Sequence, residues 1–123
     1  MTIKSDFPER RKHRRFKVQK GFLAVSSPDY SRLGQIKDVS KGGLAFEYLA
    51  DTSSTEEPFE VEIFSTDHVF NLKLPVKKVA DFKLDAKGLY DSLLIRQMSF
   101  QFGKLNHSQE SLLDQFIHRY THN

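Results

Sequence analysis

The chain has 123 residues, a net charge of +3 from 19 Lys and Arg against 16 Asp and Glu, and no cysteine. This length suits one compact domain, and the absence of thiols excludes disulfides, thiolate metal sites and a cysteine nucleophile. No apolar run reaches the roughly 18 residues that a transmembrane helix needs, and the polar first residues do not resemble a secretion signal. We therefore expect a cytoplasmic protein without membrane insertion.

Residues 1–15 form a basic arm without apolar periodicity. Residues 4–20 hold eight Lys or Arg against two acids, whereas the rest of the chain holds eleven against fourteen. Such a segment cannot bury itself, so the sequence predicts a flexible, exposed arm that meets an anionic partner. Nucleic acid, a nucleotide, lipid headgroups and an acidic protein all fit at this point.

Short apolar runs separated by turn residues predict five to seven antiparallel strands after the arm. The runs are 16–25 with a bulge at Gly21, 33–38, 44–49, 59–64, 69–74, 76–79 and 98–102. The fourth and fifth runs are expected to form a hairpin, Pro75 to interrupt and bend the next strand, and residues 81–91 to form a loop. Short strands at this spacing favour a small barrel, because closure removes exposed edges.

The last part of the chain predicts one amphipathic helix over about residues 108–120. Asn106 or Ser108 can cap it, and its apolar residues recur at helical spacing: Leu112, Leu113, Phe116, Ile117 and Tyr120. We expect this apolar stripe to close one end of the barrel. Residues 16–123 are thus predicted to form a single domain of strands with a terminal helix.

Two overlapping arginine pairs lie in the arm, Arg10 with Arg14 and Arg11 with Arg15. A guanidinium group is a planar fork that binds phosphate or a guanine edge through two hydrogen bonds, and it stacks on purines. The pairs therefore favour a planar, hydrogen-bonding anion. Taken alone, they also fit a solvated basic tail.

The segment Asp38-Val-Ser-Lys-Gly-Gly43 lies between two predicted strands. A carboxylate can accept from two adjacent donors, such as N1–H and N2–H₂ of guanine, and Ser40 adds a small donor and acceptor. Gly42 and Gly43 allow a backbone to approach a ligand closely. The alternative is an ordinary Asx turn that closes a strand connection.

Together, the arm and this segment resemble the signature of the PilZ domain, R-x-x-x-R followed by [DN]-x-S-x-x-G. The two parts read Arg11-Lys-His-Arg-Arg15 and Asp38-Val-Ser-Lys-Gly-Gly43, and the predicted strands and helix fall where this family has them. The resemblance implies an all-β fold, a six-stranded antiparallel split barrel with a C-terminal helix. It also implies a bacterial, non-enzymatic receptor that binds cyclic di-GMP.

The resemblance also implies roles for single residues. Arg11 and Arg15 hold guanine edges and phosphates, Asp38 and Ser40 read a guanine, and Gly43 keeps the turn open. We assign Arg10, Arg14, Gly42 and Val79 to the same site on the following grounds. In the family, an arginine directly before the pair, as Arg10 is here, accompanies an intercalated dimer of the ligand. The register Arg10 with Arg14 also satisfies the spacing. Gly42 lets the backbone approach a ligand, and in relatives a residue from the strand near Val79 often packs on the ligand.

Other functions remain as alternatives. The chain has no catalytic motif, and His118 with His122 fits two solvated residues better than a metal site. His13, inside the arm, is either a pH-sensitive donor near a phosphate or a bystander. A general single-stranded nucleic-acid binder is disfavoured by the acidic body, so no DNA is expected. An adaptor of pilus, flagellar or exopolysaccharide machinery with a vestigial site is the other alternative, and either receptor or adaptor needs an effector protein as partner.

Overall fold

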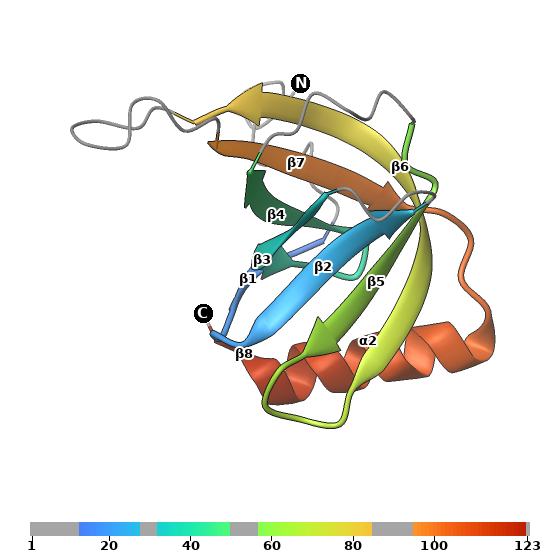
Figure 1. The fold of residues 1–123 in the computed structure, drawn as a ribbon. Coiled ribbons are helices and arrows are strands. Elements are labelled where there is room, and N and C mark those ends of the chain that lie inside the picture. The colour runs from blue at the N-terminus through green and yellow to red at the C-terminus, as the bar shows by residue number, and fades with distance from the viewer. Residues whose placement is uncertain (1–12, 28–31, 50–56, 85–94, 123) are drawn as a thin grey trace, which may run out of the picture.

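A computed structural model describes residues 13–27, 32–49, 57–84 and 95–122, which form a β-barrel with a helix against one end (Figure 1). Arg10 and Arg11 lie outside the described residues. The strands are β1 (Phe16–Val18), β2 (Phe22–Ser27), β3 (Leu33–Val39), β4 (Gly43–Leu49), β5 (Glu60–Ser65), β6 (Asn71–Lys83), β7 (Ile95–Phe102) and β8 (Thr121–His122), and the helix is α2 (His107–Tyr120).

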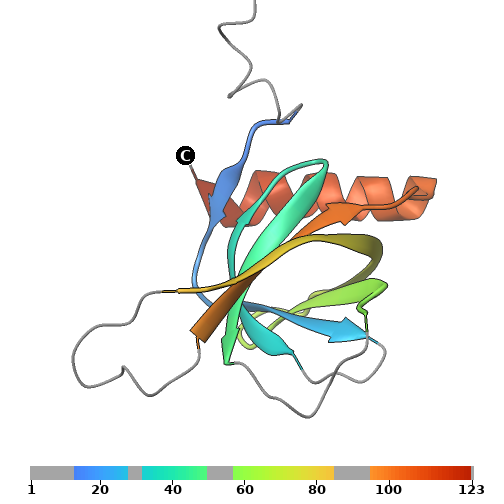
Figure 2. The same ribbon diagram turned by 90° about the horizontal axis from the view of Figure 1, so that it is seen from above.

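Six strands close the barrel in the order β2-β5-β6-β7-β4-β3, because β2 also pairs with β3. All pairings are antiparallel, as expected for strands joined by turns. The short β1 adds to β3 and β8 adds to β1, outside the closed ring. In Figure 2 the strands surround the interior while α2 lies along one side of it. The predicted six-stranded antiparallel barrel with a C-terminal helix is therefore confirmed.

The barrel interior is apolar because each strand alternates inward and outward side chains. In β5, Val61 and Ile63 are fully buried, whereas Glu60 and Glu62 remain partly exposed. The helix contributes Leu113 and Phe116 to the same core, as its spacing predicts. Asn106 caps this helix through a reciprocal pair of hydrogen bonds with Gln109, so the first of the two predicted caps is the one used.

The prediction that Pro75 interrupts a strand is wrong, because β6 runs unbroken from Asn71 to Lys83. Pro75 pairs with Glu60, the first residue of β5, and the pairing with β7 begins one residue later at Val76. The missing N–H therefore falls where β6 passes from one neighbour to the other, and Gly103 N–H still donates to the Pro75 carbonyl. The register shift lies further on, between Lys78 and Ala80.

Two other local predictions also need correction. Gly21 adopts a φ of 98° in a turn between β1 and β2, and is not a bulge within one strand. The predicted loop at 81–91 begins too early, because residues 81–83 belong to β6, and residues 85–91 lie outside the described residues. Likewise, β7 begins at Ile95, three residues before the predicted run. Among the described residues, no helix has the length and apolarity needed to cross a membrane.

Candidate functional site

The two signature segments meet where β1 begins and β3 ends. The β1–β3 pairing sets Lys17 opposite Asp38. Just before β1, the Arg15 Nε–H donates to Asp38 Oδ1 over 2.8 Å. Both side chains are partly buried, with exposed fractions of 19% for Arg15 and 31% for Asp38. Residues 23 positions apart are thus joined at the edge of the barrel by the register of one short strand.

Ser40 organises the turn between β3 and β4. Its side chain is almost fully buried, and its Oγ accepts hydrogen bonds from the N–H groups of Gly42 and Gly43 over 3.0 and 3.2 Å. The Ser40 N–H also donates to the Gly43 carbonyl over 2.8 Å. These contacts hold the turn in a fixed shape. The predicted contact between Ser40 and a guanine stays a prediction.

Gly43 is required by a close backbone approach. It opens β4 opposite Gln101 of β7, and a Cβ atom at this position would lie 2.1 Å from the Phe100 carbonyl oxygen. Any side chain here would push β4 away from β7. This packing explains why the turn ends in glycine without invoking a ligand.

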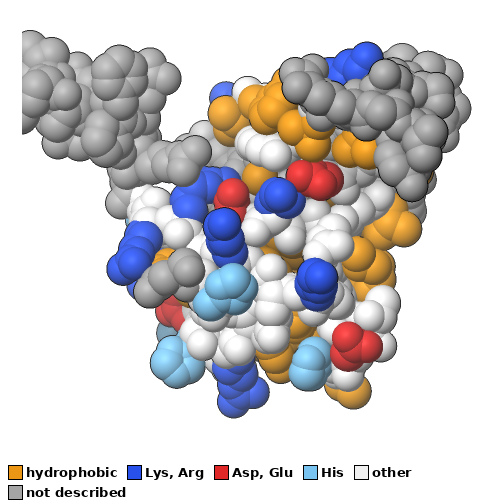
Figure 3. All heavy atoms as spheres, turned by 90° about the vertical axis from the view of Figure 1, so that its left-hand side faces the viewer, with side chains coloured by type: hydrophobic (Ala, Val, Ile, Leu, Met, Phe, Trp, Pro, Cys, Tyr) orange, Lys and Arg blue, Asp and Glu red, His pale blue; other side chains and the backbone are white. Residues whose placement is uncertain are grey.

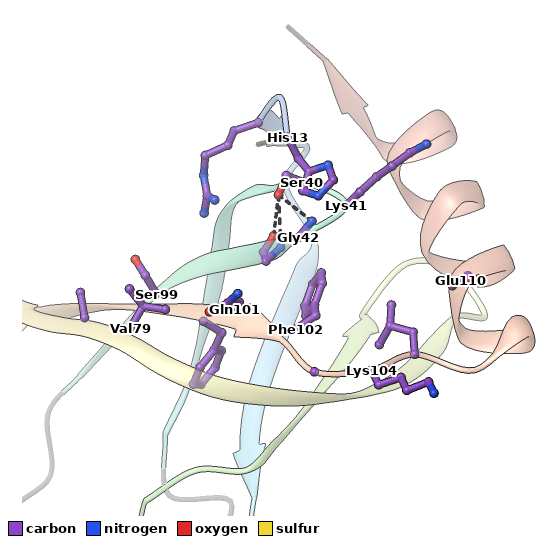
Figure 4. A pocket seen from close by; sticks show the side chains of 16 residues that line it. His13, Ser40, Lys41, Gly42, Val79, Ser99, Gln101, Phe102, Lys104 and Glu110 are labelled. Carbon is purple, nitrogen blue, oxygen red and sulfur yellow. Dashed lines mark hydrogen bonds between the residues drawn. The ribbon is translucent and has the colours of Figure 1, made fainter. Parts of the chain in front are cut away.

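An open cleft of about 850 Å³ lies beside this turn (Figure 4). Its walls come from the residues before β1, the β3–β4 turn, β6, β7 and the start of α2. The lining residues include His13, Arg15, Ser40, Gly42, Gly43 and Val79. The cleft therefore brings together four residues of the predicted site from two distant segments, with Val79 from a third. Asp38 does not line the cleft itself, but its ion pair with Arg15 connects it to the cleft.

The outer face of the sheet beside the turn is a row of small side chains. Strand pairing aligns Asp38 with Ala45, Ala45 with Ser99, and Ser99 with Ala80. Of these, Ser99 and Ala80 line the cleft. Ala45 is buried, so Ser99 and Ala80 are the small side chains of this row against which a flat group could lie.

Val79 lines the cleft from β6. The register shift between Lys78 and Ala80 leaves Val79 without a partner on β7, and its side chain is 63% exposed. A bulge of this kind redirects a side chain away from the regular alternation. Figure 4 shows Val79 near Ser99, with Gln101 further along β7. The candidate position near the ligand thus lies at the cleft, although its role stays a prediction.

Lysine, arginine and histidine side chains are spread over the face of the molecule in Figure 3, with acidic side chains between them. At the cleft, Arg15, Lys41 and Lys104 contribute cations, and Glu110 contributes an acid. Lys41 extends toward α2, where its Nζ lies 4.0 Å from Asp114 Oδ1. The Arg14 guanidinium lies 5.2 Å from the centre of the Phe16 ring, a cation–π distance. The cleft is thus suited to an anion that also has a flat surface.

A polar network that the sequence did not reveal lies beyond the bulge in β6. The Tyr48 hydroxyl donates to the Asp81 carboxylate over 2.8 Å, and Arg96 Nε–H donates to the same carboxylate over 2.9 Å. Burial and then the hydrogen bond to Asp81 raise the pKa of Tyr48. The hydrogen bond to Asp81 likewise raises the pKa of Arg96. These contacts join β4, β6 and β7, and so hold β6 next to the bulge that carries Val79.

His118 and His122, which the sequence places one helical turn apart, lie away from the cleft. Within the described residues, no group of three or more His, Asp, Glu or Cys side chains is arranged to hold a metal ion. His118 and His122 lie at the end of α2 and in β8, away from the residues that line the cleft. Nothing in this region adds to the candidate site.

The model of the PilZ domain family matches residues 9–119 of the chain. The chain is similar to the solved PilZ domain of YcgR from Escherichia coli with c-di-GMP, at 18% identity and a TM-score of 0.62, with 90% of this chain and 91% of that chain covered. Against YcgR from Escherichia coli in complex with c-di-GMP the identity is 15% and the TM-score 0.64, over 89% of this chain and 45% of that one.

A third solved relative is MotI/DgrA, an inhibitor of motility from Bacillus subtilis, at 18% identity and a TM-score of 0.57. The alignment covers 89% of this chain and 50% of MotI/DgrA. The chain therefore spans about half the length of MotI/DgrA and of the longer YcgR structure. At these identities the similarity shows a shared fold. No curated protein matches the chain in sequence.

Proposed function

The chain belongs to the PilZ domain family, and we propose that it is a non-enzymatic receptor for cyclic di-GMP that signals to an effector protein. The observation that carries this proposal is the Arg15–Asp38 ion pair of 2.8 Å beside the cleft. It joins Arg15 of the first part of the signature to Asp38 of the second part. The solved PilZ domain of YcgR, which has the same fold, was determined with c-di-GMP.

The ion pair has capacity left for a ligand. It uses Nε of Arg15 and Oδ1 of Asp38, whereas a guanidinium carries five N–H donors and a carboxylate two acceptor oxygens. Arg15 can therefore donate to a phosphate or a guanine edge while Asp38 accepts from guanine N–H groups. Because each side chain already orients the other, less conformational entropy is lost when the ligand binds.

The floor of the cleft accounts for a flat ligand. The small Ala80 and Ser99 lie side by side through the β6–β7 pairing and line the cleft, and Val79 lies next to them at the bulge. A guanine ring that lies on this row would contact Val79 at its edge and the turn at Gly43. The shape of the outer face thus favours a purine over a bulky, non-planar anion.

In this proposal the arm closes over the bound nucleotide. We assign Arg10, Arg11 and Arg14 to its phosphates and bases on the signature, with Arg10 supporting a second, intercalated nucleotide. Fixing each arm residue costs about 1–2 kcal/mol of backbone entropy. Each bidentate guanine contact returns about 1–3 kcal/mol, by analogy with base readout in DNA. Several contacts must therefore form together, and the closed arm presents a new surface to the effector protein.

Isothermal titration calorimetry with cyclic di-GMP tests the proposal. The wild type should bind, and Asp38→Asn should weaken binding at least tenfold, because the amide keeps the shape but loses the charge that orients Arg15. Asp67→Asn, in the exposed turn between β5 and β6, is the matched control and should bind as the wild type does. No heat with the wild type, or equal affinity for all three proteins, would refute the proposal.

A competition experiment separates this function from general nucleic-acid binding. Labelled single-stranded DNA is offered with and without cyclic di-GMP over a range of salt concentrations. We expect weak retention of DNA, because the positive charge is concentrated in the arm. Tight retention with a steep dependence on salt, unaffected by cyclic di-GMP, would instead favour binding to many phosphates.

A further inference from the structure

The imidazole of His13 lies against the β3–β4 turn and lines the cleft (Figure 4). A Cβ atom built on Gly42 would lie 2.7 Å from His13 Cδ2 and 3.5 Å from His13 Nε2. The ring therefore covers the Gly42 backbone in close contact. His13 is two residues from Arg15, so the ring and the Arg15–Asp38 ion pair flank the same end of the cleft.

The signature R-x-x-x-R and [DN]-x-S-x-x-G specifies neither His13 nor Gly42. Gly43 is explained by its approach to the Phe100 carbonyl. Gly42 needs another reason, because Gly21 is the positive-φ glycine of the described residues and Gly42 has a backbone that other residues adopt. The contact that the structure gives it is with His13, whose imidazole would have to move aside for a Cβ atom at position 42. His13 and Gly42 thus form a pair that fits a ring onto the turn.

We propose that His13 contacts a phosphate of the bound cyclic di-GMP and takes up a proton as the ligand binds. This inference rests on the proposed function. A phosphodiester is fully ionised near neutral pH, and an imidazolium ring offers it two N–H donors. Histidine is also the side chain that ordinarily changes charge between about pH 5 and pH 8. A ring placed in this cleft therefore couples binding to pH.

The charges around the ring determine the direction of the effect. Arg15, Lys41, Lys104 and Glu110 line the cleft together with His13, and Asp38 and Asp114 are joined to it by ion pairs with Arg15 and Lys41. Two of the three acids already have cationic partners, Asp38 with Arg15 and Asp114 with Lys41. The cations and acids around the ring thus balance in number, so a bound anionic ligand is the change that favours its protonated form.

The affinity for cyclic di-GMP should therefore rise as the pH falls. The bound state takes up more protons than the unbound state, so lowering the pH shifts the equilibrium toward the complex. Between about pH 8 and pH 6 we expect the wild type to bind three- to tenfold more tightly at the lower pH. Binding should also be accompanied by the uptake of a fraction of a proton.

Calorimetry with cyclic di-GMP at about pH 6 and pH 8, in two buffers with different ionisation enthalpies, measures both quantities. His13→Gln should bind with nearly the same affinity at the two pH values and without proton uptake. Gly42→Ala should lose the pH dependence as well, because its methyl group displaces the ring. His118→Gln, on α2 away from the cleft, is the matched control and should retain the wild-type response.

The outcomes distinguish this inference from the function on which it rests. If His13→Gln retains the pH dependence of the wild type, His13 is not the coupled group, although cyclic di-GMP binding stands. If the wild type binds equally at both pH values, the inference fails in the same way. If the wild type does not bind at either pH, the receptor function fails and the inference fails with it. Thermal unfolding of Gly42→Ala shows whether any loss reflects misfolding.

Discussion

The barrel interior and the cleft use opposite faces of the same strands. In β4, Leu44 and Phe46 belong to the core of the barrel, whereas the small Gly43 and Ala45 alternate with them on the other face and are also buried. In β7, Phe100 points inward beside the outward Ser99. Large apolar side chains on one face stabilise the fold, while small ones on the other leave space for a ligand. The comparison shows that stability and binding are assigned to alternate residues, so substitutions should separate them.

The largest effect should come from the interior, with Phe116→Ala. The Phe116 side chain is fully buried, and its ring packs against Phe22 at 5.1 Å and Phe70 at 5.3 Å between ring centres. Its loss should lower the free energy of unfolding by about 3–5 kcal/mol, measured by urea denaturation. Phe59→Ala, at a phenylalanine that is 59% exposed, is the control and should change stability little. A tolerated Phe116→Ala would show that the helix is not part of the core.

Arg15→Ala should have the next largest effect, and it should fall on the cleft. The substitution removes the guanidinium group that pairs with Asp38, which belongs to the arginine directly before the first strand of the barrel. We expect a loss of affinity for cyclic di-GMP of about a hundredfold, measured by calorimetry, because several contacts depend on this residue. The free energy of unfolding should change by less than about 1 kcal/mol. Arg119→Ala, in the last turn of α2, is the matched control. A large loss of stability with unchanged affinity would contradict the assignment of Arg15 to binding and would show that it stabilises the fold instead.

Tyr48→Phe examines the network between the interior and the cleft. It removes the hydrogen bond of 2.8 Å to Asp81 and should cost about 1–2 kcal/mol of unfolding free energy at neutral pH. Burial, followed by the bond to Asp81, raises the pKa of Tyr48. The folded protein therefore holds the phenolic proton more tightly than the unfolded chain, and this stabilisation is present below the ordinary value of about 10 and is lost as the pH rises above it.

Denaturation of wild type and Tyr48→Phe at neutral pH and above about pH 10 tests both effects. The gap in stability between the two proteins should shrink at high pH, because only the wild type loses this contribution. Tyr120→Phe, at a tyrosine in the aromatic cluster beside Phe22, provides a control for the loss of a hydroxyl group. A gap that stays constant with pH would contradict the role assigned to the Tyr48 proton.

The smallest effect is expected on the outer face away from the cleft. Lys37 Nζ lies 3.2 Å from Glu47 Oε2, and about half of the lysine side chain is exposed. Lys37→Ala should change the free energy of unfolding by at most about 0.5 kcal/mol. At high salt this difference from the wild type should become smaller still, because salt screens an exposed ion pair. Affinity for cyclic di-GMP should not change. A marked loss of either property would mean that the binding surface extends beyond the cleft.

Most of the barrel could be predicted from the sequence because its signals are local. The alternation of Val61 and Ile63 with Glu60 and Glu62 predicts a strand with one buried face, and Asn106 with Gln109 predicts the start of α2. The path of β6 could not be predicted in this way. Pro75 usually ends a strand, and only the transfer of pairing from β5 to β7 at this residue explains why the strand continues.

The candidate site divides in the same manner. The signature segments and the charge of the arm are sequence properties, and from them the residues Arg15, Asp38 and Gly43 could be predicted to lie together. That Val79 reaches the cleft depends on a bulge of one residue, and that Tyr48, Asp81 and Arg96 meet depends on the register of three strands. Neither leaves a spacing pattern in the chain.

The sequence by itself thus determined roughly where the strands and the terminal helix lie along the chain, the charge of the arm and the motif, because each of these arises from the periodicity or chemistry of neighbouring residues. Tertiary structure alone decided which outward side chains share one cleft, and that His13 lies on Gly42. The physical reason is that strand register and barrel closure place residues that are far apart in the chain within a few ångströms of one another, and a shift of one residue would turn each of them to the opposite face.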